Sequence, residues 1–118
     1  MSELVTADTS GPVPVARIAG EIDLANAARV REDAVALAAD APGLIVDLTT
    51  VSYLDSAGVR VLFQLARDLR QRDQSLLVIV PVGSPLRRVL KITSFHEVAP
   101  ICDDIEAAFK FLTPTNEP

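Results

Sequence analysis

One stretch decides the fold: Leu44-Ile45-Val46-Asp47-Leu48, then Thr49-Thr50-Val51-Ser52-Tyr53-Leu54, then Asp55-Ser56-Ala57-Gly58-Val59. Its first five residues are a short, mostly aliphatic run after a Pro-Gly pair, which is typical of a buried strand. Residues 49–54 are predicted to form a loop. Beyond the loop, apolar residues recur at the spacing of one helical face: Val59, Leu62, Leu65, Ala66 and Leu69. The stretch therefore predicts a strand, a loop and an amphipathic helix.

Ser56 stands where this helix is predicted to begin, and its hydroxyl has two interpretations. Asp55 and Ser56 are both favourable N-cap residues, although Val59 stands where a capping box needs Glu or Gln. Alternatively, Ser56 is a modification site, because a phosphate at a helix N-terminus meets unpaired N–H donors and the positive end of the helix dipole. The small Ala57 and Gly58 leave room for another protein's active site. The local chemistry alone favours the cap.

The remaining segments add strands and helices on both sides of this unit. Strands are predicted at residues 2–7, 13–19, 75–82 and 98–101, and residues 20–23 are predicted to end the second of them. Helices are predicted at residues 26–39 and 85–92, and from a capping-box-like Asp103-Asp104-Ile105-Glu106 to about residue 111. The alternation of strands and helices indicates right-handed crossovers and a largely parallel set of central strands.

Parallel topology has a consequence for the site. Loops that follow parallel strands open at one edge of the sheet, where sites gather in open α/β folds. The loops predicted at residues 20–23 and 49–55 both follow such strands, so Asp23, Asp55 and Ser56 are expected to be neighbours. A purely structural role remains open for both carboxylates: Asp23 as a cap for the helix near Asn26, and Asp55 as a turn residue.

Length and composition restrict the class of protein. The chain has 118 residues, 49% of them hydrophobic, which suits one α/β domain over residues 1–112 followed by a polar tail, 113–118, that is predicted to be disordered. The net charge of −5 argues against a nucleic-acid-binding surface. No apolar run approaches the roughly 20 residues of a membrane helix, so no membrane insertion and a cytoplasmic location are expected. The single Cys102 excludes an internal disulfide and is interpreted as a buried thiol.

The sequence favours a protein without catalytic activity. A nucleophilic serine needs a base, and the single histidine, His96, lies far along the chain in a segment predicted to be an exposed loop. Leu54 occupies the position where a nucleophile elbow has glycine. The sequence has neither a glycine-rich phosphate loop with lysine nor a histidine or cysteine cluster for zinc. A phosphate acceptor is the more economical interpretation of Ser56, and no cofactor or metal is expected.

Three segments occur in an order and at spacings that are typical of a known domain family. They are Gly20-Glu21-Ile22-Asp23, the Val46-Asp47-Leu48 strand with Tyr53-Leu54-Asp55-Ser56-Ala57-Gly58 and Val61-Leu62, and Leu86-Arg87-Arg88-Val89-Leu90. Together they resemble the STAS domain, in the form of a bacterial anti-sigma factor antagonist, over about residues 13–109. The resemblance implies a single-domain STAS-like α/β fold with a mixed, mostly parallel sheet of four to five strands and about four helices. One departure is Ser94, where the family commonly has glycine; a left-handed backbone there would cost roughly 1–2 kcal/mol.

The resemblance also implies a function. The serine of the family's Asp-Ser-x-Gly motif is phosphorylated, which maps to Ser56 and favours phosphorylation over the plain cap. The implied partners are an anti-sigma factor with serine kinase activity, which binds the unphosphorylated protein, and a serine phosphatase. The implied partner-binding residues are Gly20, Glu21, Asp23, Tyr53, Asp55, Ser56, Ala57, Gly58 and Val59. The alternative is a non-switching STAS accessory subunit of a transporter or of a stress-signalling assembly.

Overall fold

The computed structural model describes residues 4–112. Within that range, five strands and four α-helices follow one another in the alternating order that the sequence predicts. The elements are β1 (Val5–Asp8), β2 (Val15–Ile22), α1 (Ala27–Ala38), β3 (Gly43–Leu54), α2 (Ser56–Gln71), β4 (Ser75–Ile79), α3 (Leu86–Ile92), the 3-10 turn η1 (Phe95–Glu97), β5 (Ile101–Cys102) and α4 (Ile105–Leu112).

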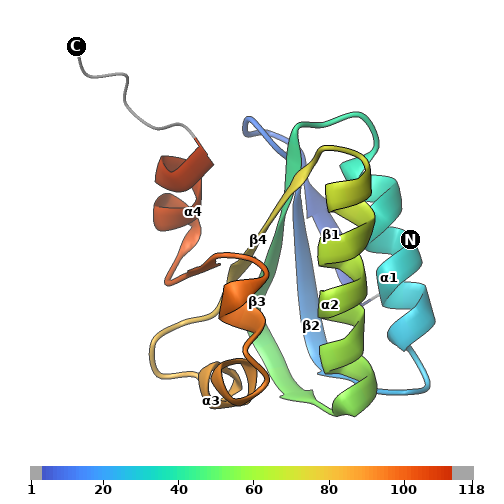
Figure 1. Cartoon of the computed structure of the whole chain (residues 1–118), viewed down its shortest axis with the longest axis vertical. Coiled ribbons are helices and arrows are strands. Elements are labelled where there is room, and N and C mark those ends of the chain that lie inside the picture. The colour runs from blue at the N-terminus through green and yellow to red at the C-terminus, as the bar shows by residue number, and fades with distance from the viewer. Residues whose placement is uncertain (1–3, 113–118) are drawn as a thin grey trace.

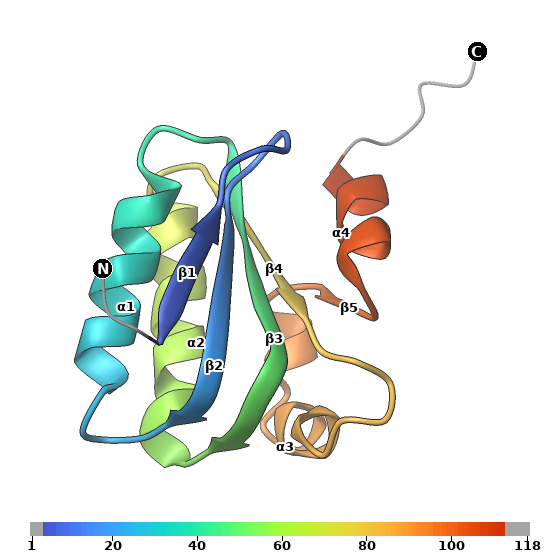
Figure 2. The same cartoon turned by 180° about the vertical axis from the view of Figure 1, so that it is seen from behind.

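The strands form one mixed sheet in the order β1-β2-β3-β4-β5. β1 is an antiparallel edge strand on β2, and the pairs β2–β3, β3–β4 and β4–β5 are parallel. Helices α1 and α2 lie side by side on one face of the sheet, and α4 lies on the other (Figures 1 and 2). The mostly parallel, single-domain α/β fold predicted from the sequence is therefore confirmed.

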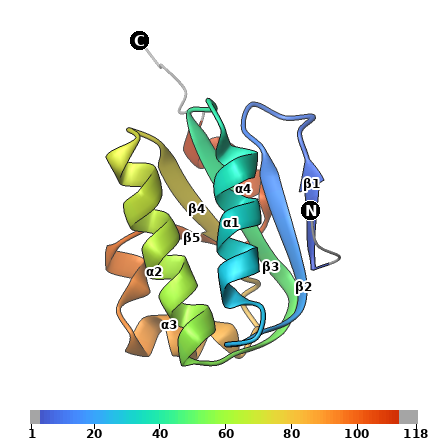
Figure 3. The ribbon, with the colours of Figure 1, turned by 90° about the vertical axis from the view of Figure 1, so that its right-hand side faces the viewer.

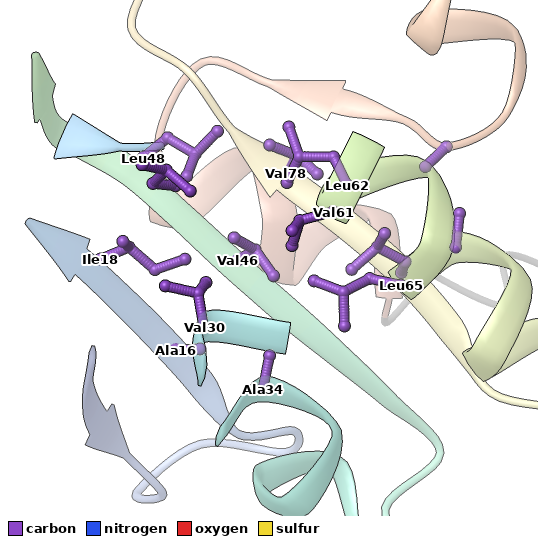
Figure 4. Close-up of a cluster of buried hydrophobic side chains, with 14 of the residues drawn as sticks. Ala16, Ile18, Val30, Ala34, Val46, Leu48, Val61, Leu62, Leu65 and Val78 are labelled. Carbon is purple, nitrogen blue, oxygen red and sulfur yellow. The ribbon is translucent and has the colours of Figure 1, made fainter. Parts of the chain in front are cut away.

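Alternation along β3 divides the core into two layers. Val46 and Leu48 point toward α1 and α2, where they meet Val30, Leu62 and other aliphatic side chains (Figure 4). Ile45, the residue before Val46, points to the opposite face and packs on the α4 side of the sheet. Each of these buried aliphatic side chains contributes roughly 1.5–3 kcal/mol to folding. The two layers fix the sheet between its helices and thereby fix the ends of its strands.

The central strand is longer than predicted, because the expected loop at residues 49–54 is the second half of β3. β2 also continues beyond the predicted end at residue 19: Gly20, Glu21 and Ile22 belong to the strand, which ends at Ile22. Ile22 pairs with Leu54, and both side chains are buried, so the extended pairing keeps apolar surface from water. The register shifts between Arg17 and Ala19 and again between Gly20 and Glu21, and Gly20 has a φ of 85°. This irregular pairing was not visible in the sequence.

The remaining boundaries differ by a few residues. β4 ends at Ile79, three residues before the predicted end, and β5 begins at Ile101, because residues 95–97 form a 3-10 turn. α4 is capped by Asp104, which accepts from the N–H of Ala107 at 2.8 Å, whereas the predicted capping box would have used Asp103. The first part of the strand predicted at residues 2–7 and the tail predicted at 113–118 lie outside the described residues.

Ser94, which stands where the family commonly has glycine, adopts a left-handed backbone conformation. It connects α3 to η1 with a φ of 62° and a ψ of 27°. The next residue, Phe95, is fully buried and packs edge-on against Phe63 of α2, with ring centroids 5.1 Å apart. The buried aromatic contact holds the connection in place despite the conformational cost at Ser94.

Candidate functional site

The carboxyl ends of β2 and β3 meet at one edge of the sheet, as parallel topology predicts. The connections from β2 to α1 and from β3 to α2 turn at the same end of the molecule (Figure 3). Glu21 stands beside Tyr53 in the strand register, and Ile22 stands beside Leu54. Two loops more than thirty residues apart in sequence are thus brought together, and they carry the residues that the sequence singled out.

Asp55 joins the two loops and caps α2. One carboxylate oxygen, Oδ1, accepts from the backbone N–H of Gly58 at 2.9 Å, and Oδ2 accepts from the N–H of Leu24 at 3.2 Å. The backbone N–H of Asp55 donates to the carbonyl of Ile22 at 3.2 Å. Asp55 is therefore the N-cap of the helix and the link to the β2–α1 loop, which is more than the turn residue that the sequence left open.

Ser56 is the first residue of α2 and does not cap it. Its side chain is exposed, and its hydroxyl has no hydrogen-bond partner among residues 4–112. The neighbouring hydroxyls differ: Thr50 Oγ1 donates to the Ile18 carbonyl at 3.1 Å, and Ser52 Oγ donates to the Gly20 carbonyl at 3.3 Å. The N-cap is therefore Asp55, and the N-cap interpretation of Ser56 is wrong.

The β2–α1 loop is held by reciprocal hydrogen bonds between Asp23 and Asn26. Asp23 Oδ1 accepts from the N–H groups of Ala25 at 3.0 Å and Asn26 at 3.3 Å. Asn26 Oδ1 accepts from the N–H of Asp23 at 3.0 Å, and Asn26 Nδ2 donates to the Glu21 carbonyl at 2.8 Å. Asp23 thus shapes a turn before α1, and Asn26, which sequence reasoning did not select, holds that turn to the end of β2.

Gly58 allows α2 to approach the sheet closely. A Cβ atom at this position would lie 2.7 Å from the Ile22 carbonyl oxygen and 3.0 Å from Leu54 Cδ2. Gly58 is buried and therefore does not itself lie on the predicted partner-binding surface. Its role is to let the first turn of α2 pack closely against β2. Ala57 and Val59 on either side are half-buried and pack against the core.

Two large apolar side chains are exposed on the elements that end at this edge of the sheet. The Leu24 side chain, on the β2–α1 loop, is 81% exposed, and the Tyr53 side chain, near the end of β3, is 52% exposed. Large apolar groups left in water beside an unpaired hydroxyl are typical of a surface that another protein covers. The sequence predicted Tyr53 but missed Leu24; its position beside the clustered residues 20–23 was the one available indication.

A groove of about 820 Å³ runs between α1 and α2 from this surface. Leu24, Ala57 and Arg60 lie among its lining residues. Farther along, Arg31 of α1 binds Asp68 of α2 through two hydrogen bonds of 2.8 and 2.9 Å. The Arg31 guanidinium holds the pKa of the Asp68 carboxyl below its usual range, and the same contact raises the pKa of Arg31. This ion pair links the two helices across the groove.

The described part of the chain offers no sign of a metal centre or a membrane span. Among residues 4–112, no three His, Cys, Asp or Glu side chains gather as metal ligands would. No helix in the same range has the length and apolar character needed to cross a bilayer. Cys102 is buried, as predicted, and its pKa is raised by burial and then by the neighbouring Asp103. His96 lies in η1 with an exposed side chain.

Comparison with known proteins identifies the class. The model of the STAS domain family matches residues 5–108, so the chain belongs to the STAS domain family. It is 38% identical over 86 residues to an anti-sigma-B factor antagonist of Listeria monocytogenes, covering 71% of this chain and 74% of that protein. It is 34% identical over 90 residues to the anti-sigma-F factor antagonist RsfB of Mycobacterium tuberculosis, covering 75% of this chain and 71% of that one.

Solved structures agree on the fold. An anti-sigma factor antagonist from Mycobacterium paratuberculosis superimposes with a TM-score of 0.80 at 24% identity, over 91% of each chain. Unphosphorylated SpoIIAA, also an anti-sigma factor antagonist, gives a TM-score of 0.70 at 20% identity, over 94% of this chain and 99% of that one. These likenesses show that the chain shares its overall fold with solved anti-sigma factor antagonists.

Proposed function

We propose that this protein is an anti-sigma factor antagonist that switches partners through phosphorylation of Ser56. The relatives that it matches at 34–38% identity carry that name, which supports the proposal. The observation that carries it is the exposed, unpaired hydroxyl of Ser56 at the start of α2, beside a capping Asp55 that makes Ser56 unnecessary for the helix. Because Ser56 does not cap the helix, its modification need not disturb the start of α2.

In the unphosphorylated state, the surface formed by Leu24, Tyr53 and the first turn of α2 binds an anti-sigma factor. Burying the exposed Leu24 and Tyr53 side chains supplies apolar contact area, and the Ser56 hydroxyl lies within that contact. The bound anti-sigma factor then releases the sigma factor that it held. This role places the protein in the cytoplasm, and the protein itself catalyses no reaction.

The anti-sigma factor acts in turn as a serine kinase. Ser56 Oγ attacks the γ-phosphorus of ATP, the bond from that phosphorus to the β,γ-bridging oxygen breaks, ADP leaves, and the hydroxyl proton passes to a base of the kinase. The phosphate adds about −1.5 to −2 charges beside Asp55 and Asp23. Like-charge repulsion and desolvation favour release, and a penalty of about 2.8 kcal/mol lowers affinity roughly a hundredfold. A serine phosphatase restores the first state.

Calorimetry with the purified anti-sigma factor tests the switch. Ser56→Glu is expected to bind at least about tenfold more weakly than the unmodified protein, and Ser56→Ala to bind normally but accept no phosphate from ATP. Ser10→Glu is the matched control, because Ser10 lies on the β1–β2 loop at the opposite end of the sheet (Figure 1). Equal affinity of Ser56→Glu and Ser10→Glu would contradict the charge switch and favour the accessory-subunit alternative.

A further inference from the structure

Arg60 stands one helical turn beyond Ser56 on α2. Residues four apart lie on the same face of a helix, with Cβ atoms about 5–6 Å apart. The Arg60 side chain is exposed and lines the groove between α1 and α2 together with Ala57 and Leu24. A group attached to Ser56 Oγ would therefore extend toward the mouth of this groove, within reach of the long arginine side chain.

The charge of Arg60 is not neutralised within the described part of the chain, where it forms no ion pair. The positions three and four residues away on α2 hold Ser56, Ala57, Phe63 and Gln64, and none of them is acidic. Arg31, a second arginine of the groove, differs because Asp68 binds it at 2.8 Å. The Asp55 carboxylate accepts hydrogen bonds from Gly58 and Leu24.

We propose that Arg60 is the intramolecular partner of the phosphate on Ser56, an inference that rests on the proposed function. A guanidinium presents paired N–H donors that match two phosphate oxygens, and such charge-assisted pairs are short and strong. The first turn of α2 adds the backbone N–H donors of Ser56 and Ala57, which have no partner inside the helix, whereas the N–H of Gly58 already donates to Asp55. Phosphate on Ser56 thus meets a cation and helix donors on its own chain.

Several acidic groups belong to the elements around the site. Asp55 caps the same helix, Asp23 and Glu21 come from the β2–α1 loop and the end of β2, and Glu32 of α1 lines the groove. These carboxylates disfavour a dianion at Ser56. Of the other two arginines that line the groove, Arg31 is bound to Asp68, and Arg72 follows the far end of α2, where it donates to the Ala39 carbonyl. Arg60 is therefore the group that offsets them.

This pairing changes what phosphorylation does to the docking surface. In the unphosphorylated protein, Arg60 is available to a carboxylate of the anti-sigma factor. After phosphorylation, the same guanidinium is bound to the phosphate, so one modification removes both the hydroxyl and a cation from the surface. Release then follows from lost attraction as well as from added repulsion.

A phosphorus NMR titration of protein carrying phosphoserine at position 56, inserted during translation, tests the pairing without a kinase or a partner. The second pKa of the phosphate is expected to be about half a unit lower with Arg60 than with Arg60→Gln, because the guanidinium favours the dianion. Arg60→Lys is expected to keep most of the depression. Arg67→Gln is the matched control: Arg67 is exposed on the same helix, about 16 Å from Ser56 along the helix axis, and its removal is expected to leave the phosphate pKa unchanged.

The results separate this inference from the proposed function. A phosphate pKa that is the same with Arg60 and with Arg60→Gln would overturn the pairing, whatever the binding data show. An equal shift for Arg60→Gln and Arg67→Gln would also overturn it, because only the general charge of the helix would then matter. Failure of the anti-sigma factor to distinguish Ser56→Glu from Ser56→Ala would overturn the switch and leave the NMR result intact.

Discussion

Asp55 and Ser56, adjacent at the start of α2, have different roles. The Asp55 side chain holds the helix and the β2–α1 loop through its hydrogen bonds to the N–H groups of Gly58 and Leu24. The Ser56 side chain has no such contact among the described residues. Sequence reasoning found both residues but could not assign the cap, because Asp and Ser are about equally good at that position. The assignment depends on which side chain faces the loop from β2, a long-range contact.

Gly58 gives the sharpest test at the scale of a single residue. Gly58→Ala is expected to lower the free energy of unfolding by about 1–3 kcal/mol, because the new Cβ would lie 2.7 Å from the Ile22 carbonyl and force α2 away from β2. Urea denaturation followed by circular dichroism measures this change. Gly83→Ala is the control, since no atom lies within 4 Å of its added Cβ. Similar stabilities for the two variants would contradict the close packing described here.

At the scale of elements, helices were predicted more closely than strands. The bounds of α1 and α3 agree with the sequence to within a residue or two, because the periodic apolar positions and the caps that define them are local. The second half of β3 was missed because it depends on pairing with β2. Tyr53 and Leu54 find their strand partners Glu21 and Ile22 thirty-two residues away, and no local pattern reports such a pairing. Leu24 was missed for the same reason, because its N–H contacts Asp55 farther along the chain. Asn26 was missed although its contacts, to Asp23 and Glu21, are local.

The ion pair between α1 and α2 predicts a dependence of stability on pH. The pKa of Asp68 is lowered in the folded protein, chiefly by the Arg31 hydrogen bond. The ionised Asp68 carboxylate therefore adds to the free energy of unfolding above the unfolded pKa of about 3.9, and this stabilisation is lost as the pH falls through the lower folded value. Asp68→Asn is expected to cost up to about 1 kcal/mol at pH 7, the range of a partly exposed pair.

Urea denaturation of both proteins from pH 7 down to pH 3 checks this prediction. The difference in unfolding free energy between the natural chain and Asp68→Asn is expected to shrink as the pH falls. Asp40→Asn is the control, because Asp40 is exposed in the loop after α1 and no hydrogen bond or ion pair of its side chain occurs within residues 4–112. A difference that stays constant over this range would show that the Asp68 charge contributes nothing to helix packing.

At the scale of the whole molecule, the sheet is protected on both faces. α1 and α2 cover one layer of the core, and α4 covers the other, in which Cys102 lies with Ile79 and Ala108. The aliphatic composition predicted such a core, but it could not predict which face each helix would cover. Cys102 is 8% exposed, and burial raises its pKa. The reactivity of its thiol therefore shows whether α4 stays packed on the sheet.

Alkylation by iodoacetamide at pH 7.5 measures that integrity. Native Cys102 is expected to react more than about tenfold more slowly than the same thiol in 8 M urea, because the thiolate is the reactive form and burial disfavours it. A chain with Cys102→Ser and Ser10→Cys supplies an exposed reference thiol that should react alike in both conditions. Equal native rates for the two thiols would mean that α4 does not close over the sheet.

The capping of α2 by Asp55 also has a kinetic consequence. A helix whose first turn is secured by one residue can gain and lose a phosphate on the next without unwinding and refolding at each cycle. In the proposed switch, the speed of turnover is then set by the kinase and the phosphatase alone, and the chain adds no slow conformational step of its own. A cell could thus change the ratio of the two states as quickly as it changes the activities of those two enzymes.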